Sequence, residues 1–267
     1  MLKKNVLILL VLFMAACGFY GCHASESSTD SKAEILYEDV ADISVFRRNI
    51  DVQIVQIPLL VNKELHTLTI NGFQGENFQP AAIKFSSGFE CEYQGCYLYI
   101  ITLEFDPKAI AVSDADVYFS AIDLAIDETE TVYHFGKAEI KNTVAENVND
   151  FIGIQSLGLG YQTLDRLSFC IEANKDITVE NIDTTSGYTI NNEEKYLGLL
   201  PEGGLLSCEL EVDSQSLNKL YYCFDLFVEY TSDQQPYTFY FTGSSIQTSM
   251  SSRLADFVNH RTENMTK

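Results

Sequence analysis

The chain has no tryptophan, only four histidines, and far fewer basic than acidic residues. Lysine and arginine number 17 against 38 aspartates and glutamates, which gives a formal net charge of −21 at pH 7. A polyanion cannot neutralise phosphates, so this balance argues against a nucleic-acid partner. It also predicts repulsion from anionic membrane surfaces and a solvated, acidic exterior. The absence of tryptophan counts against a carbohydrate-binding platform.

The short motifs of the commoner catalytic and cofactor sites are missing as well. The chain contains no Cys-x-x-Cys, no Gly-x-Ser-x-Gly, no glycine-rich phosphate loop and no calcium-loop pattern. His23, His66, His134 and His260 are scattered, with no spacing of histidine and cysteine that suits zinc. We therefore expect no catalytic residue, no cofactor and no metal, and a protein that is not an enzyme.

Close pairs of carboxylates keep one enzymatic alternative open. The pairs and clusters are Asp114/Asp116, Asp127/Glu128/Glu130 and Asp225/Glu229. General acid–base catalysis needs two carboxylates at a defined separation in an apolar cleft. Nothing in the spacing selects one pair, and solvated strand faces and turns account for all of them. An envelope hydrolase that uses paired carboxylates is the alternative.

The first 22 residues contain the parts of a secretory signal. Lys3 and Lys4 form a short basic start, and residues 6–16 (VLILLVLFMAA) are an unbroken apolar run. Eleven residues make a helix of about 16 Å, which is too short for a hydrocarbon core of about 30 Å. Extension to Cys22 still gives a short span, so an uncleaved anchor is the lesser alternative.

The end of this run, Met14-Ala15-Ala16-Cys17, resembles the lipobox of bacterial lipoproteins. The family pattern is an aliphatic residue, two small residues and a cysteine. The resemblance implies cleavage before Cys17, diacylglycerol on its thiol and, in some bacteria, acylation of the new amino group. Cys22 is a second candidate for lipidation, and an ordinary signal with an incidental cysteine is a further alternative. Two or more acyl chains hold a protein stably on a bilayer.

These features predict an extracytoplasmic protein that is lipid-anchored to the cell membrane, with the bilayer as one partner. Residues 1–16 are then the signal peptide, and residues 17–34 the lipidated cysteine and a flexible tether rich in serine and acid. Because the signal peptide carries two lysines and no acid, the remaining chain has a net charge of −23.

The rest of the chain, from residue 35 onward, is predicted to form strands, because short segments of alternating apolar and polar residues recur between turn residues. One short helix is expected at residues 252–262. The expected strands are 52–60, 65–71, 81–85, 96–105, 116–126, 131–141, 166–173, 177–182, 205–212, 220–229 and 237–247.

We expect an all-β fold of two tandem β-sandwich modules, at residues 35–145 and 146–250, with a tail at 251–267. The joint lies within 142–160, which has no clear strand pattern. About six strands per module suggest an immunoglobulin-like sandwich. Cys170 and the run Tyr221-Tyr222-Cys223 superficially resemble the cysteines and tyrosine corner of that family. Each of the two cysteines, Cys170 and Cys223, lies on the face of its strand that is opposite the apolar face. A disulfide across the core is therefore not expected.

Cys91 and Cys96 are the best candidates for a disulfide. They flank Gly95 in a short loop, and closing so small a ring would stabilise the fold by about 2 kcal/mol. Two free thiols are the alternative. Cys208, between Leu206 and Leu210, is expected to be a buried, small apolar side chain.

The sequence thus predicts a non-catalytic binding or assembly role at the cell envelope. The partner is an unidentified protein or envelope ligand, and nucleic acid is not expected. A structural spacer within a larger surface complex is a further alternative.

Overall fold

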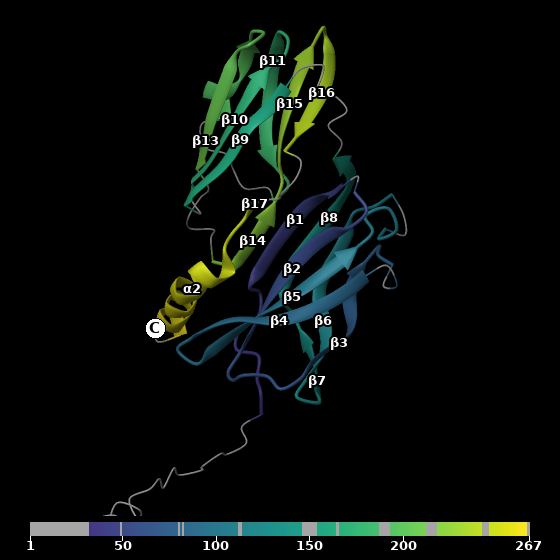
Figure 1. The fold of residues 1–267 in the computed structure, drawn as a ribbon, viewed down its shortest axis with the longest axis vertical. Helices are drawn as coiled ribbons and strands as arrows, with labels where there is room; N and C mark the ends of the chain where they lie inside the picture. Colours follow the sequence, from purple (N-terminus) through teal and green to yellow (C-terminus); the bar gives the residue numbers. More distant parts are fainter. Residues whose placement is uncertain are drawn as a thin grey trace, which may run out of the picture. The chain divides into compact units, whose positions relative to one another are not determined.

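The computed structural model describes residues 32–48, 50–79, 81, 83–111, 114–145, 154–163, 166–186, 193–211, 218–241 and 246–265. These residues form an all-β fold of the sandwich type, with one α-helix, α2 (Met250–Met265), and a short 3-10 helix, η2 (Glu193–Tyr196) (Figure 1). Ala33–Lys267 forms one compact unit. The expected signal peptide, Cys17 and Cys22 lie outside the described residues.

The first sandwich packs a three-stranded sheet, ordered β2-β5-β4, against a seven-stranded sheet, ordered β17-β14-β1-β8-β6-β3, in which β7 also pairs with β6. With β2 to β6 and β8 lettered B to G, strands B, E and D share one sheet and C, F and G the other, which is the immunoglobulin order. The strands are β1 (Ala41–Arg48), β2 (Gln53–Val61), β3 (Leu68–Glu76), β4 (Ile83–Tyr93), β5 (Cys96–Phe105), β6 (Val117–Ile126), β7 (Thr129–Tyr133), β8 (Gly136–Ala145), β14 (Tyr221–Phe224) and β17 (Ile246–Gln247).

The second sandwich combines sheets ordered β13-β10-β9 and β12-β11-β15-β16. The strands are β9 (Ile154–Thr163), β10 (Arg166–Ala173), β11 (Ile177–Thr184), β12 (Gly198–Leu200), β13 (Leu205–Glu211), β15 (Leu226–Ser232) and β16 (Gln235–Tyr240). Its core buries Phe169, Ile171 and Cys208 with side chains from β11, β15 and β16. Cys208 is 1% exposed, which confirms its predicted burial.

Three hairpins close through two-residue turns with positive φ at both positions. These turns are Gln94-Gly95 between β4 and β5, Asp127-Glu128 between β6 and β7, and Asp233-Gln234 between β15 and β16. Such turns match the right-handed twist of the strands they join. They fix the register of each hairpin, and hence which side chains face a core.

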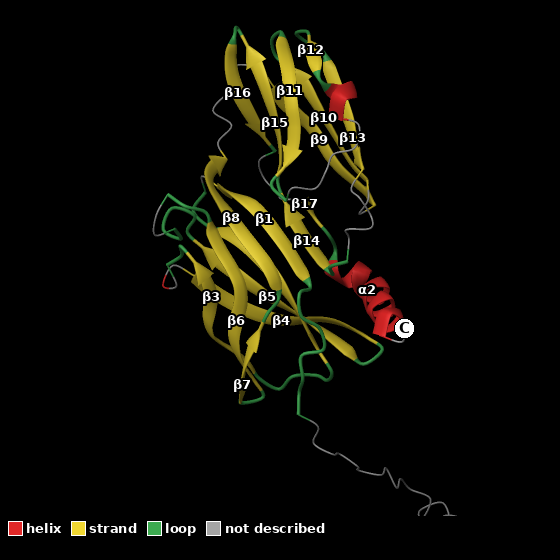
Figure 2. Ribbon diagram, turned by 180° about the vertical axis from the view of Figure 1, so that it is seen from behind, coloured by secondary structure: helices red, strands yellow, loops and turns green. Residues whose placement is uncertain are grey.

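Helix α2 completes the first core at one end of the three-stranded sheet (Figure 2). Met250, Leu254, Phe257 and Val258 recur at the spacing of one helix face, and all four are buried. They belong to the same core as Leu98, on the face of β5 that points away from the opposing sheet. The expected C-terminal helix is therefore present, although the sequence placed it in a tail.

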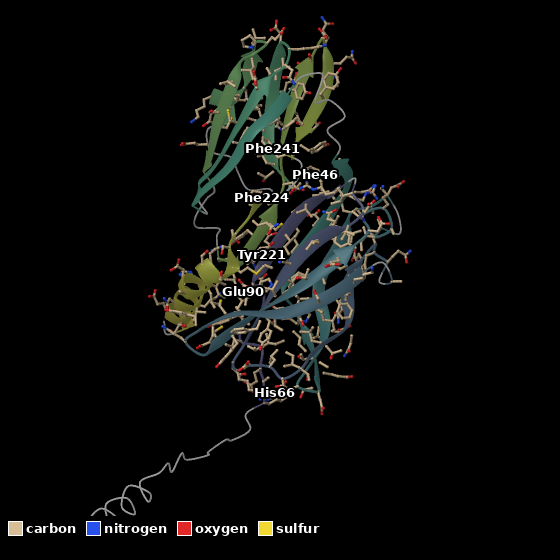
Figure 3. All side chains as sticks on the ribbon, viewed as in Figure 1. Phe46, His66, Glu90, Tyr221, Phe224 and Phe241 are labelled. Carbon is tan, nitrogen blue, oxygen red and sulfur yellow. The ribbon has the colours of Figure 1, made fainter. Side chains whose placement is uncertain are left out.

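One continuous stretch of chain serves both cores. Only Asp225 separates β14 from β15. Tyr221 and Cys223 belong to the first core, whereas Tyr222 and Phe224 belong to the second (Figure 3 labels Tyr221 and Phe224). β14 pairs in parallel with β1 in the first sandwich, and β15 pairs with β11 in the second.

This sharing differs from the sequence expectation in two ways. The alternation of the strand predicts that Cys223 and Asp225 lie away from its apolar face, but they are only 4% and 3% exposed, and Tyr221 on the same face is 2% exposed. Residues 220–224 were assigned to a second module within 146–250, yet β14 is a strand of the first sandwich's sheet. The physical reason is that both faces of β14 are covered, which alternation within a single strand does not reveal.

Candidate functional site

The three-stranded sheet ends in a long strand with no further neighbour. β4 pairs with β5 and lies at the edge of the order β2-β5-β4 (Figure 1). All seven residues from 84 to 90 are exposed. Within the described residues, no backbone hydrogen bond links β4 to any segment other than β5. Because an edge strand presents unpaired N–H and C=O groups, it is a template for pairing with another strand.

Two aromatic side chains mark this edge. Phe85 pairs with Leu103, and Phe89 with Tyr99, so both lie on the face of the sheet that looks toward the first core. They are nonetheless 48% and 53% exposed. Phe89 meets Tyr99 edge-to-face with ring centroids 5.6 Å apart. The core is therefore open to solvent along β4, with large apolar side chains at the opening.

Other sheet edges are shorter or interrupted. β3, the edge of the opposing sheet, contains two register shifts, between Ile70 and Gly72 and between Gln74 and Gly75. β12 has three residues, and β16 has six and contains Pro236. Bulges, proline and short length all discourage strand addition. β4 has one bulge, between Phe89 and Cys91, at its far end.

A pocket of about 320 Å³ lies on the other face of the same sheet. Gln56, Glu90 and Ile100 line it from β2, β4 and β5, and residues 247–251, from the end of β17 to the start of α2, complete the lining (Figure 3 labels Glu90). Ser249 accepts a long hydrogen bond of 3.5 Å from the amide of Ser252 and so caps the helix. Glu90 is the one carboxylate among the described residues of its lining.

Cys91 and Cys96 are free thiols in this structure. Tyr93 lies opposite Cys96, and Cys91 lies opposite Leu98, so the two cysteines are diagonal neighbours across the hairpin. Diagonal neighbours are typically about 7–8 Å apart, whereas a disulfide needs Cβ atoms about 3.5–4.5 Å apart. Burial raises the pKa of Cys96 to about 11, with a further contribution from Cys91. The geometry therefore favours the free-thiol alternative.

Four of the carboxylates that the sequence analysis named, Asp116, Asp127, Asp225 and Glu229, make separate contacts in the structure. Asp127 accepts hydrogen bonds of 2.9 and 3.0 Å from the amides of His66 and Thr67, which tie the β6–β7 turn to the segment before β3. Asp116 accepts a hydrogen bond of 2.7 Å from the amide of Asn142. Glu229 accepts one of 2.9 Å from Asn181. Each acts on nearby backbone or side chains.

Asp225 instead forms a buried ion pair with Arg48. Its second oxygen accepts a hydrogen bond of 2.7 Å from the amide of Phe46. Arg48 also donates to the carbonyl of Phe241, at 3.3 Å. The pair thus joins β1 of the first sandwich to the residue before β15 and the residue after β16, which are adjacent strands in one sheet of the second sandwich.

A second polar group lies on the same strand, β1. Ser44 donates to the carbonyl of Thr185 at 2.7 Å, and Thr185 donates back to the carbonyl of Ser44. Glu139, opposite Ser44 on β8, is 4% exposed. Burial raises its pKa, but hydrogen bonds from Lys141, Lys137 and Tyr118 outweigh burial and hold the pKa below its usual 4.5. Sequence reasoning missed the contacts of Arg48 and Ser44 with the second sandwich, because the partners are 141–193 residues apart.

The described residues contain no group of three or more histidine, cysteine or acidic side chains that could hold a metal ion. No helix among them has both the length and the apolar character that crossing a bilayer requires. No protein-family model matches the chain. No curated protein matches it either.

Proposed function

We propose that this chain is a lipid-anchored protein of the cell envelope that binds or assembles with another protein through the edge of β4. The observation that carries the proposal is the exposed run of residues 84–90 on an edge strand, with Phe85 and Phe89 beside it. Main-chain hydrogen bonds would supply affinity, and the two aromatic rings would supply contact area.

The location rests on the N-terminal sequence. Acyl chains on Cys17 would attach the protein to a membrane that its net charge of −23 after cleavage would otherwise repel. A tether rich in serine and acid, up to about 40 Å long for residues 23–34, would let the body stand clear of the lipid headgroups.

A spacer role is the second candidate, and one observation favours it. The shared β14–β15 stretch and the buried Arg48–Asp225 pair hold the two sandwiches through fixed contacts. A rod that braces a partner needs such a joint. The binding role and the spacer role are compatible if a partner binds at β4 and the second sandwich sets the distance between that partner and the rest of a surface complex.

The decisive experiment is capture from gently solubilised envelopes with the lipidated protein as bait. We compare the wild type with Phe89→Lys and with a matched control, Leu199→Lys. Leu199 is 75% exposed on β12, so its substitution adds the same charge away from β4. The proposal expects a specific prey with the wild type and the control, and its loss with Phe89→Lys. Equal capture by all three baits contradicts a role for β4.

A further inference from the structure

We infer that the partner at the β4 edge is a second copy of this chain, paired antiparallel about Ser87. The inference rests on the proposed function only in taking β4 as the contact surface. It commits to a register, to a symmetry and to particular residue pairs.

The sequence of β4, IKFSSGFECEY, is self-complementary around Ser87. When two copies run antiparallel with Ser87 opposite Ser87, Lys84 lies opposite Glu90 of the second copy. Phe85 then lies opposite Phe89, and Ser86 opposite Gly88. Each contact occurs twice, because a two-fold axis makes the interface isologous.

The faces of the strand agree with this register. Lys84 pairs with Glu104 of β5, and Glu90 lines the pocket with Ile100, so both lie on the face of the sheet that points away from the opposing sheet. Phe85 and Phe89 lie on the other face. Opposite residues therefore share a face, as an antiparallel ladder requires. Opposite charges and aromatic rings directly across from one another stabilise such a ladder.

The charges at this edge are open to a partner. Within the described part of the chain, neither Lys84 nor Glu90 has an ion pair within 4.0 Å, although Lys84 faces Glu104 across the hairpin. Two copies of a chain with a net charge of −21 repel each other. The attraction between Lys84 of one copy and Glu90 of the other offsets some of this repulsion.

Small side chains allow close approach at the centre. Ser86, Ser87 and Gly88 are exposed, and a Cβ atom added at Gly88 would have no atom within 4 Å. The register shift between Phe89 and Cys91 makes Glu90 the extra residue of the bulge, and the paired run ends at this residue. A register centred on Gly88 sets Lys84 opposite Glu92, but Glu92 lies beyond the bulge, opposite Tyr97, and therefore on the other face of the sheet from Lys84. The Ser87 register is therefore the favoured one.

The first test is disulfide formation across the axis, in the full chain on membranes. Ser87→Cys places two thiols opposite each other in a dimer, whereas Ser86→Cys and Gly88→Cys place them diagonally. After mild oxidation, a non-reducing gel should show a dimer for Ser87→Cys and only the wild-type background for the other two. Equal crosslinking at all three positions, or a stronger dimer at 86 or 88, overturns the inference.

The second test reverses the charges in the Ser87→Cys background. Lys84→Glu or Glu90→Lys alone sets like charges against each other twice per dimer, and we expect about tenfold weaker dimerisation. The double reversal should restore it. Lys175→Glu is the matched control for Lys84→Glu, because it makes the same change in net charge at an exposed site in the second sandwich. If the double variant is as weak as the singles, the partner is not a second copy in this register.

Repeating the crosslink with Cys17→Ser separates this inference from the anchor. A dimer that persists while the protein leaves the membrane supports the pairing and identifies Cys17 as the membrane attachment. If the Ser87→Cys protein with Cys17 intact is lipidated and membrane-bound but never crosslinks at 87, the result contradicts the pairing alone.

Discussion

Arg48 and Asp225 form an ion pair that is buried where the two sandwiches meet, with side chains 10% and 3% exposed. Arg48 ends β1, and Asp225 is the single residue between β14 and β15. The pair also engages the amide of Phe46 and the carbonyl of Phe241. It therefore sits at the point where the chain passes from one core to the other.

Removal of one partner should be strongly destabilising. Asp225→Ala leaves the Arg48 guanidinium buried without its counter-ion, and we expect a loss of about 3–5 kcal/mol in the free energy of unfolding. Urea denaturation measures this loss. Lys175→Ala is the control, because Lys175 is 48% exposed in its ion pair with Asp233 and its loss should change stability by less than about 0.5 kcal/mol. Similar effects for the two variants would contradict a structural role for the buried pair.

Glu139 predicts a particular acid sensitivity. Its pKa in the folded state is lowered from 4.5, so the stability that it contributes is present above that value and is lost as pH falls through the lowered pKa. Glu139→Gln keeps the shape but cannot ionise. Stability should therefore depend less steeply on pH below about 4.5 in this variant than in the wild type. Parallel pH profiles for the two proteins, measured by urea denaturation, would refute the assignment.

The cysteines should be reduced and slow to react. Burial raises the pKa of Cys96 to about 11 and that of Cys208 to about 12, so neither is a thiolate at neutral pH. In denaturant without reductant, all five thiols of the folded body should be alkylated, as read by intact mass. A mass that lacks two alkyl groups, with a crosslinked peptide that joins Cys91 to Cys96, would contradict this prediction and support the disulfide for which the sequence made these cysteines candidates.

The shared strand predicts that the two cores unfold together. Phe224→Ala empties a large buried site in the second core and should reduce the free energy of unfolding by about 3–5 kcal/mol. Because β14 also pairs with β1, hydrogen exchange should accelerate in the first sandwich as well. Leu199→Ala, at an exposed site, serves as the control. Faster exchange confined to the second sandwich would show that the cores are independent.

Sequence patterns predict most of the strands that have one buried face and one solvent-exposed face. The expected strands at 96–105 and 166–173 have the bounds of β5 and β10. β1 was missed because its alternating stretch, ADISV, covers only five residues and is followed directly by Phe-Arg-Arg. β9 was missed because its segment, rich in glycine, lies in the supposed joint. Period-2 patterning is weak in a short run and in a glycine-rich segment.

The candidate site was missed for a different reason. The sequence ended its strand at Phe85, because Ser86-Ser87-Gly88 resembles a turn. β4 continues through these residues to Tyr93, and the apolar signal was the period-2 series Ile83, Phe85 and Phe89. Residues in the middle of an edge strand need not face a core, so they can be polar or small. A search for alternating apolar residues therefore does not detect such a strand.

Mass spectrometry of the mature N-terminus tests the central claim most directly, because the proposed location depends on Cys17. We predict that the mature chain begins at Cys17 and carries a diacylglyceryl group on its thiol, with label from a palmitate analogue lost in Cys17→Ser and retained in Cys22→Ser. An intact leader, or a mature N-terminus at which Cys17 carries no lipid, would contradict the account.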